Sequence, residues 1–236
     1  LPTLSLEEAL EVTKIYSIAG LLPENANLIN WRPFRSPHHT ITRAGLVGGG
    51  KIPQPGEISL SHLGVLYLDE VPEFRPDVLN LLRQPMEDGC ITISRTAGSV
   101  TYPARFMLVA SKNPCPCGFL GDRLKECICS FPQIRNYHQR ISGPILDRID
   151  LFIEVPRMSR EELMNAPSGE TSKDIQDRVE KARKLQQDRF QGLGIFCNAH
   201  MGARETERFC VVKGKARRLL QSAVTHFGLS ARAYAR

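Results

Sequence analysis

The chain lacks long apolar runs, and its longest run, Phe106 to Ala110, has only five residues. A helix that crosses a bilayer needs roughly 20 mostly apolar residues, so a membrane-spanning segment is excluded. Aromatic side chains are scarce as well, at 7% with a single tryptophan. Hydrophobic residues at 42% and charged residues at 24% are nevertheless ordinary for a globular protein, which argues against wholesale disorder.

The chain also lacks the marks of a secreted, disulfide-linked protein. Its seven cysteines are an odd number, and its start does not resemble a signal peptide, so we expect a reducing cytoplasm. The net charge of +6 suits a polyanionic partner such as nucleic acid, although charge alone is a weak indication. Because the chain begins at Leu1 and ends inside an apparent helix, we expect a piece of a longer protein.

Helix and strand patterns alternate through the first part of the chain and predict a parallel, layered α/β sheet. Core strands are expected at 64–68, 105–113 and 151–155. Helices are expected over 5–19, from Pro76 to a stop at Gly89, and over 133–140, with a strand and long loop over 30–56 and a β-hairpin over 91–102. After Pro156 the pattern is helical, so we expect an α/β core over 1–156 and an all-helical second domain over 157–236.

Two adjacent acids follow the most apolar predicted strand. Asp69 and Glu70 are expected at the carboxyl edge of the sheet, where open α/β folds bind ligands. Asn113 ends the next core strand, which in a parallel sheet would lie beside them. In P-loop ATPases one such acid holds Mg²⁺ and a second carboxylate orients or deprotonates the attacking water. These residues favour a nucleotide site; the alternative is a strand that ends in polar residues at the surface.

Four cysteines lie in one predicted loop. Cys115, Cys117, Cys127 and Cys129 form a C-x-C-x9-C-x-C pattern, in which four thiolates can close a tetrahedral Zn²⁺ site. The usual ribbon spacing is C-x2-C, so four free thiols are the alternative. We expect structural zinc here.

Four longer strings resemble a known family. They are RPFRSPHHT, GEISLSHLGVLYLDEVPEF, ITISRTAGSVTYPARFMLVASKNPCPCG and RISGPILDRIDLFIEV. These strings resemble the magnesium-chelatase-like AAA+ ATPases, in particular the competence protein ComM (YifB) group. The resemblance implies an AAA+ core followed by a helical lid, assembled as a ring, expected to be a hexamer, with ATP between subunits.

The resemblance also implies roles for single residues. Asp69 would bind Mg²⁺, Glu70 would be the catalytic carboxylate, and Asn113 would be the sensor 1 residue. Arg148 is similar to the arginine finger that reaches into a neighbouring subunit and stabilises charge on the transferred phosphoryl group. An ion pair of Arg148 with a flanking acid is the alternative. Arg232 resembles sensor 2, a nucleotide-binding residue.

No segment of the sequence fully matches the phosphate-binding loop that such an ATPase needs. Residues 45–52, GLVGGGKI, nearly match G-x-x-x-x-G-K-[ST], but Ile52 stands where Mg²⁺ needs a hydroxyl. Pro53 and Pro55 oppose the helix whose first amides hold phosphate. We expect the true loop upstream of Leu1. The chain by itself is therefore predicted to hydrolyse no ATP and, with unpaired strand edges, to self-associate.

Two basic residues lie in segments that resemble the pore-facing hairpins of related translocases. Lys51 belongs to a segment similar to the insert in helix 2 of this clade, and Arg95 to a segment similar to the hairpin before sensor 1. Both are candidate contacts to DNA phosphates, and solvated loops are the alternative.

The favoured function is a cytoplasmic, Mg²⁺-dependent ATPase that remodels DNA, with branch migration during natural transformation as the family role. One rival is a magnesium-chelatase subunit that metallates a porphyrin. The other is a non-enzymatic, zinc-stabilised nucleic-acid-binding module, in which Asp69 and Glu70 are incidental.

Overall fold

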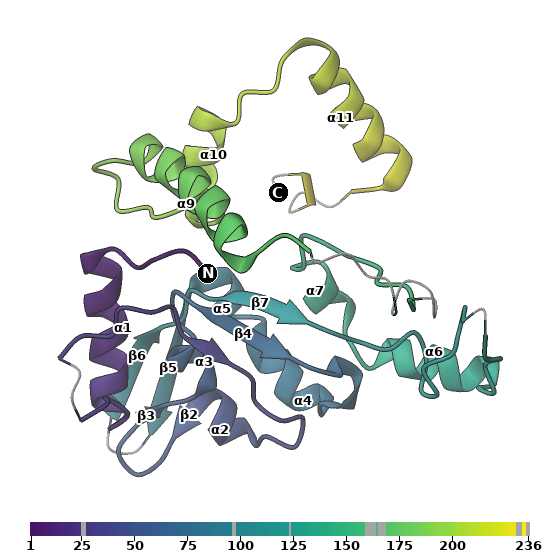
Figure 1. The fold of residues 1–236 in the computed structure, drawn as a ribbon, viewed down its shortest axis with the longest axis horizontal. Helices are drawn as coiled ribbons and strands as arrows, with labels where there is room; N and C mark the ends of the chain where they lie inside the picture. Colours follow the sequence, from purple (N-terminus) through teal and green to yellow (C-terminus); the bar gives the residue numbers. More distant parts are fainter. Residues whose placement is uncertain are drawn as a thin grey trace. The chain divides into compact units, whose positions relative to one another are not determined.

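Contacts between residues divide the structure, a computed structural model, into two units (Figure 1). One unit comprises residues 3–160, and the other comprises residues 161–236 together with residues 1–2. The structure describes residues 1–24, 27–95, 98–122, 124–158, 164, 169–229 and 233–234.

The first unit is built on a parallel sheet with the strand order β1-β4-β7. The strands are β1 (Phe34–Arg35), β4 (Val65–Leu68) and β7 (Met107–Ala110). The central strand β4 is paired on both edges, and its apolar residues are buried apart from the partly exposed Tyr67. Leu68 pairs with Ala110, so the carboxyl ends of β4 and β7 lie at the same edge of the sheet. The predicted parallel α/β sheet is thereby confirmed.

The first helix, α1 (Leu6–Ile18), begins at the predicted capping box. The Ser5 hydroxyl accepts the Glu8 amide at 3.2 Å, and the Glu8 carboxylate accepts the Ser5 amide at 3.0 Å. After the helix, Gly20 adopts the left-handed conformation, with φ 67°, that ends many helices. The helix predicted over 5–19 is confirmed.

The single helix predicted from Pro76 to Gly89 is wrong, because the chain forms three short helical segments there. They are α4 (Pro76–Leu79), the 3-10 helix η2 (Asn80–Leu82) and α5 (Pro85–Asp88). Pro85 has no amide hydrogen to donate, so it starts a new helix rather than continuing the previous one. The stop at Gly89 is confirmed by its left-handed φ of 64°.

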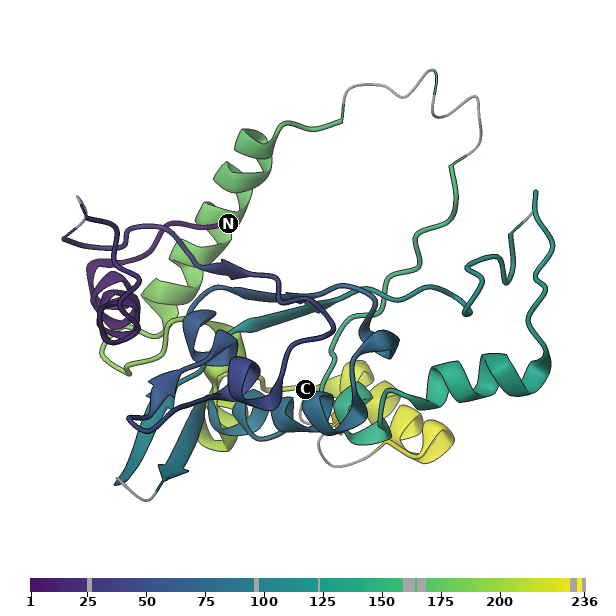
Figure 2. The ribbon, with the colours of Figure 1, turned by 90° about the horizontal axis from the view of Figure 1, so that it is seen from below.

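The remaining helical segments of this unit are short. They are α2 (Arg43–Val47), α3 (Glu57–Leu60), the 3-10 helix η1 (Val71–Glu73), α6 (Phe131–Gln139) and α7 (Gly143–Leu146). The helix predicted over 133–140 corresponds to α6, which begins at a second capping box between Ser130 and Gln133. In Figures 1 and 2, α6 and α1 lie at opposite ends of this unit.

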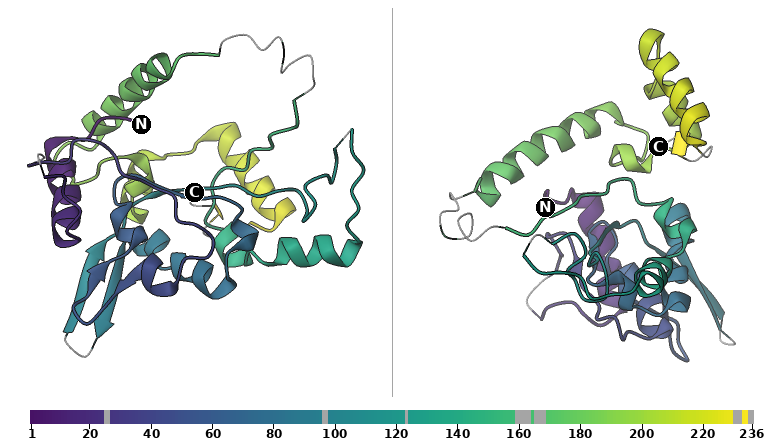
Figure 3. Two further views of the ribbon diagram at one scale, coloured as in Figure 1. Left: turned by 60° about the horizontal axis from the view of Figure 1, so that its bottom comes forward. Right: turned by 90° about the vertical axis from the view of Figure 1, so that its right-hand side faces the viewer.

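Two β-hairpins pack together in this unit. The predicted hairpin is formed by β5 (Cys90–Arg95) and β6 (Gly98–Pro103), and the second by β2 (Gly48–Gly49) and β3 (Gln54–Pro55). Gly48 has φ 106°, and a Cβ there would lie 2.2 Å from the Gln54 carbonyl oxygen and 2.7 Å from Ile93 Cδ1. Only glycine therefore allows this close approach. Figures 2 and 3 show the β5–β6 hairpin extending away from α6.

The hydrophobic core of this unit joins the sheet, the hairpins and the short helices. Its members include Leu46, Ile58, Leu66, Leu68, Phe74, Leu79, Leu82, Ile93 and Tyr102. Because β4 contributes Leu66 and Leu68 to this core, the polar residues that follow it emerge at a fixed edge of the sheet.

The strand predicted at 151–155 is wrong. These residues belong to no described strand, and Phe152, Ile153 and Val155 are 70%, 82% and 86% exposed. An apolar run becomes a strand only when its backbone groups pair with a neighbouring strand. Here β7 is the edge of the sheet, and no described strand lies beyond it. The third strand of the sheet is β1 instead.

The second unit is helical in its described residues. Its helices are α9 (Ser172–Arg189), the 3-10 helix η3 (Asn198–His200), α10 (Ala203–Phe209) and α11 (Gly214–Phe227). Phe190 is buried and contacts Phe209 edge-on, with ring centroids 5.4 Å apart. None of the described helices in either unit combines the length and the apolar content required to cross a membrane.

Candidate functional site

The carboxyl ends of β4 and β7 form a polar edge of the sheet. Asp69 and Glu70 follow β4, and Ser111 follows β7. The backbone ladder continues past the strands, because the Ser111 amide donates to the Leu68 carbonyl and the Val71 amide donates to the Ser111 carbonyl, both at 3.0 Å. This continuation brings the three polar side chains together.

Asp69 is held by three donors, all of which contact Oδ1. They are the Ser111 hydroxyl, the Tyr67 hydroxyl at 3.3 Å and the Glu70 amide at 3.0 Å. The Ser111 hydrogen bond is the largest cause of the lowered pKa of Asp69. Partial desolvation opposes it, and the Tyr67 and Glu70 donors lower the pKa further. Asp69 is therefore a preorganised carboxylate at neutral pH.

Glu70 adopts a backbone conformation that is uncommon for a residue with a side chain. Its φ and ψ of 49° and 50° are left-handed, and its amide also donates to the Ser111 hydroxyl at 3.2 Å. Such conformations cost roughly 1–3 kcal/mol and concentrate at functional sites. The turn at Glu70 redirects the chain at the end of β4, and the Glu70 carboxylate remains exposed.

Asn113 reaches the same edge from the segment after β7. Its side-chain amide donates to Glu70 Oε1 at 3.4 Å, a long hydrogen bond between exposed groups. The structure thus brings together three of the predicted site residues, Asp69, Glu70 and Asn113. A carboxylate pair with a nearby amide is suited to hold a cation and to orient a water molecule.

Two further residues support this edge and were not assigned a role from the sequence. Ser111 stands directly after β7, and its position at a strand end was the only signal available. Tyr137 lies in α6 and is buried, and the backbone amide of Asn113 acts on its hydroxyl in the sense that lowers the pKa of Tyr137. Burial is the largest cause of the raised pKa of Tyr137, and the nearby carboxylates of Glu73 and Glu70 add to it. No local pattern marks Tyr137.

Of the two arginines with predicted roles at a nucleotide, Arg148, the candidate arginine finger for a neighbouring subunit, lies among the described residues. Arg148 has a buried side chain that pairs with Glu87 Oε2 in α5 at 2.7 Å and donates to the Pro144 carbonyl. The ion pair of Arg148 shown by the structure is therefore with a residue distant in sequence. Arg232 lies outside the described residues.

The predicted DNA-contacting residues lie on the two packed hairpins. Lys51 is exposed in the turn between β2 and β3, and Arg95 is exposed at the end of β5. The hairpins are joined because the Tyr102 hydroxyl donates to the Pro53 carbonyl at 2.8 Å. The near-match to a phosphate loop, residues 45–52, contains the end of α2, strand β2 and this turn. Its glycines serve a hairpin and do not precede a long helix.

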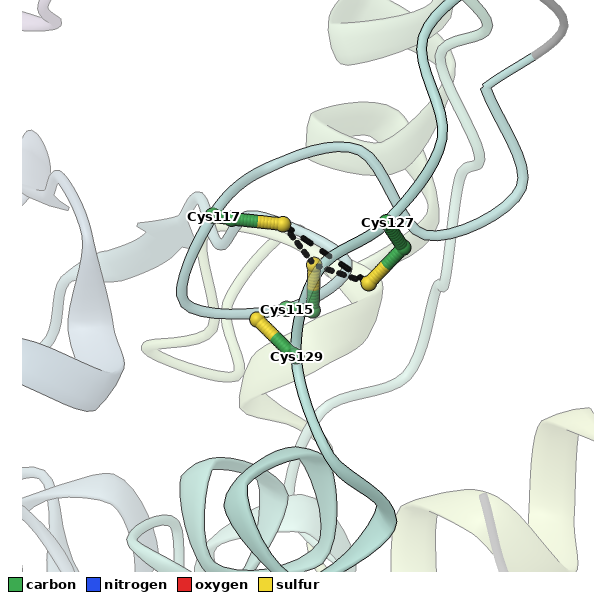
Figure 4. Close-up of side chains that lie close together, drawn as sticks. All are labelled: Cys115, Cys117, Cys127 and Cys129. Atoms are coloured by element: carbon green, nitrogen blue, oxygen red, sulfur yellow. Dashed lines mark hydrogen bonds between the residues drawn. The ribbon is translucent and has the colours of Figure 1, made fainter.

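Four thiols gather in the loop between β7 and α6 (Figure 4). The sulfur of Cys115 lies 3.4 Å from that of Cys117 and 3.6 Å from that of Cys127, and the latter two are 3.6 Å apart. With Cys129, all four sulfurs lie within 4.8 Å of one another. These separations exceed the disulfide length of about 2.05 Å, so the thiols are free. The predicted ligands are thus close enough to hold one metal ion.

Backbone amides lower the pKa values of these thiols, whereas burial and neighbouring sulfurs raise some of them. The Phe119 amide, bonded to the Cys117 sulfur, is the largest cause that lowers the pKa of Cys117 to about 6. The Cys129 amide likewise lowers the pKa of Cys127. Burial and the thiols of Cys115 and Cys117 outweigh it and raise the pKa of Cys127 to about 12. The cluster resists carrying several negative charges, and a divalent cation would remove that repulsion.

Comparisons with known proteins agree over the whole chain. Residues 1–163 match the family described as magnesium chelatase, subunit ChlI, and residues 169–236 match its ChlI C-terminal region. The chain is 45% identical over 240 residues to the competence protein ComM of Haemophilus influenzae, covering 100% of this chain and 45% of that protein. It is 44% identical over 242 residues to the uncharacterized protein YifB of Escherichia coli, covering 100% and 46%.

A more distant relative is the magnesium-chelatase subunit ChlI of Pyropia yezoensis. It is 28% identical over 141 residues, which cover 59% of this chain and 38% of that protein. The chain spans about half the length of the ComM and YifB relatives. The family matches together with the full-chain identity show that the chain belongs to the magnesium-chelatase family, as a protein of the ComM/YifB type.

Proposed function

We propose that this chain carries the catalytic edge of a Mg²⁺-dependent AAA+ ATPase that remodels DNA. The observation that carries the proposal is the meeting of Asp69, Glu70 and Asn113 at one exposed edge of a parallel sheet, with Asn113 at 3.4 Å from Glu70. Ligands bind at this edge in open α/β folds. Membership in the magnesium-chelatase family supports ATP as the ligand.

Asp69 is the residue suited to hold Mg²⁺. All its described hydrogen bonds go to Oδ1, so Oδ2 is available for a cation or a cation-bound water. The Ser111 hydroxyl also keeps the carboxylate ionised by lowering its pKa. Carboxylate oxygens are preferred Mg²⁺ ligands. When bound, ATP and Mg²⁺ would supply the phosphoryl group and the charge neutralisation that its transfer requires.

Glu70 and Asn113 are suited to act on the attacking water. The exposed Glu70 carboxylate accepts a proton or a hydrogen bond from that water, and the Asn113 side-chain amide donates to the water or to the terminal phosphate. The left-handed turn at Glu70 and the Tyr137 contact with the Asn113 backbone hold both residues in place.

The phosphate-binding loop is proposed to enter the sheet beside β7. Met107 and Val109 on that edge strand are 54% and 38% exposed, and residues 151–155 lie unpaired. A strand that pairs with both would deliver its loop to the edge that carries Asp69. The near-match at 45–52 does not serve, since it forms a hairpin. We accordingly expect the chain by itself to hydrolyse no ATP and to self-associate through this open edge.

The remaining roles concern assembly and DNA. A hexameric ring in the cytoplasm would place Arg148 at a neighbour's nucleotide, which requires its guanidinium to leave Glu87. The helical unit would be the lid, with Arg232 as its nucleotide-binding residue. Lys51 and Arg95, exposed on adjoining hairpins, would contact DNA phosphates.

Replacement of Glu70 tests the catalytic role. In the intact gene product, Glu70→Gln should still bind ATP while hydrolysis falls by roughly 10²–10⁴-fold, the usual worth of a general base. Glu73→Gln is the matched control, because Glu73 is a nearby exposed acid that pairs with Arg140 instead. Hydrolysis by Glu70→Gln at the wild-type rate would contradict the assignment.

The nature of the remodelled substrate needs a separate experiment. The identity of 45% to the competence protein ComM, against 28% to a magnesium-chelatase subunit, supports the ComM type, for which the resemblance of the sequence implies DNA rather than a porphyrin. Forked DNA should stimulate ATP hydrolysis by the intact gene product, and a porphyrin should not. Stimulation by the porphyrin alone would favour a chelatase. Binding of DNA with no ATP hydrolysis by the wild-type intact gene product would favour a non-enzymatic module stabilised by zinc at the cysteine cluster.

A further inference from the structure

The cysteine cluster lies on the segment that joins Asn113 to α6. Cys115 follows Asn113 by two positions, and Cys129 precedes the first residue of α6, Phe131, by two positions. The four sulfurs therefore come from the two ends of the connecting loop and lie close together. Figure 4 shows the four sulfurs pointing toward one another from both arms of this loop.

Local polar contacts order part of the loop, because Asp122 accepts the amides of Leu124 and Lys125 at 2.7 and 3.1 Å and pairs with Arg157 at 3.1 Å, but regular structure and an apolar core do not. Among its described residues, 114–122 and 124–130, none belongs to a helix or strand, and such long unstructured connections are uncommon in compact domains. Its larger aliphatic side chains do not form a core, because Leu120, Leu124 and Ile128 are 40%, 75% and 85% exposed. Cys115 is fully buried by contrast. The thiols thus occupy the centre that apolar side chains fill elsewhere.

The spacing of the sulfurs fits a single tetrahedral ion. Four sulfurs at about 2.3 Å from zinc stand roughly 3.8 Å apart, and the observed separations of 3.4 and 3.6 Å lie just inside that value. Backbone amides of Phe119 and Ile128 bond to the Cys117 sulfur, as partners of metal-bound thiolates commonly do. Cys117 and Cys129 are likewise joined by a backbone hydrogen bond.

Asn113 contacts residues of two other segments, the turn after β4 and helix α6. Its side chain contacts Glu70, its backbone amide contacts the buried Tyr137 of α6, and the cluster begins two residues later. If the loop opened, α6 would be tied to β7 by a long flexible connection, and the hold of Tyr137 on Asn113 would weaken. A metal ion at the cluster closes the loop and maintains that hold.

We propose that Cys115, Cys117, Cys127 and Cys129 bind one zinc ion, and that this zinc positions Asn113 against Glu70. Metal binding itself is independent of the proposed function. The positioning role rests on it, because Asn113 matters to hydrolysis only if the edge that it occupies is catalytic.

Metal content tests the first half. The chain purified without chelators should contain one zinc per molecule, and cobalt substitution should give the absorption of tetrahedral thiolate ligation. Cys115→Ser and Cys127→Ser should lose the metal, whereas Cys210→Ser, which removes an exposed thiol in the other unit, should keep it. Wild type without metal, or with the brown colour of an iron–sulfur cluster, would overturn the zinc assignment.

Hydrogen exchange tests the local effect and avoids variants that fail to fold. Chelation of zinc from the wild-type chain should speed amide exchange over 113–130, while the β5–β6 hairpin remains protected. Equal protection of 113–130 with and without zinc would overturn the positioning role.

A double-mutant comparison links the metal to Asn113. In the intact gene product, zinc removal and Asn113→Ala should each slow hydrolysis, by up to roughly 10²-fold as for a misplaced catalytic group. Zinc removal should add little to Asn113→Ala, because both changes disrupt the same interaction with Glu70. Additive effects would refute positioning through Asn113. If the zinc-loaded, wild-type intact gene product hydrolyses no ATP, the proposed function fails while the metal and exchange results stand.

Discussion

The buried ion pair between Arg32 and Glu8 is expected to dominate the electrostatic contribution to the stability of the first unit. The two side chains are 5% and 1% exposed, and Arg32 Nη2 lies 3.0 and 2.9 Å from the carboxylate oxygens of Glu8. Arg32 Nη1 also donates to the Leu63 carbonyl at 2.7 Å. One guanidinium therefore joins α1, the segment before β1 and the turn before β4.

The substitution Arg32→Met leaves the Glu8 carboxylate buried with the Ser5 amide but without its cation. Removing one partner of a buried pair costs about 3–5 kcal/mol. For a chain of this size each kcal/mol lowers Tm by roughly 2–4 °C, so a fall of about 6–20 °C is expected. Arg75→Met is the matched control, since its pair with Asp77 leaves the arginine 75% exposed and such pairs contribute about 0–1 kcal/mol.

Urea unfolding followed by tryptophan fluorescence measures this change in stability. Trp31 is the only tryptophan and adjoins Arg32, so its signal reports on this unit. The free energy of unfolding follows from linear extrapolation. Adding Glu8→Leu to Arg32→Met should restore much of the stability, because an apolar pair tolerates burial. If Arg32→Met costs no more than Arg75→Met, burial does not set the strength of this ion pair.

Three further outcomes are expected. Burial lowers the pKa of His62 below its ordinary 6.5, so the folded state binds fewer protons than the unfolded state. The free energy of unfolding should therefore fall as the pH drops below about 6.5. In urea titrations at several pH values, His62→Gln should flatten that pH dependence. Ser111→Ala should raise the pKa of Asp69 toward 3.8 in an NMR titration, and an unchanged pKa would show that the hydroxyl is not its cause. The double variant with Lys51→Gln and Arg95→Gln should weaken DNA binding by the intact gene product. The slope of log K against log salt concentration should fall by about 0.9 for each DNA phosphate that is no longer neutralised. An unchanged slope would exclude phosphate binding by these two residues.

Much of the local structure was predictable because its signals lie within a few residues. Ser5 and Glu8 predicted the start of α1, since both partners of a capping box are three positions apart. The alternation in β5 and β6 predicted their hairpin in the same way. The apolar segment before Asp69 predicted β4, and the position of the acids at its end followed directly.

Interruptions of local patterns were harder to predict. The periodicity after Pro76 favoured one helix, yet the missing amide of Pro85 divides it. At 151–155 the apolar run has the composition of a strand, but strand formation depends on a partner whose position the run does not encode.

The sequence by itself determined the residue types of the candidate site and their order: two acids after one strand, an asparagine after the next, and four cysteines in the loop that follows. Only the tertiary structure decided their partners. Ser111 reaches Asp69 from 42 positions away, and Arg148, which follows α7, pairs with Glu87 of α5. These contacts depend on strand order and on how the loop returns through α6, and both are set by packing of the whole unit. Short-range pattern therefore supplied the chemistry of the site, while long-range pairing placed and oriented it.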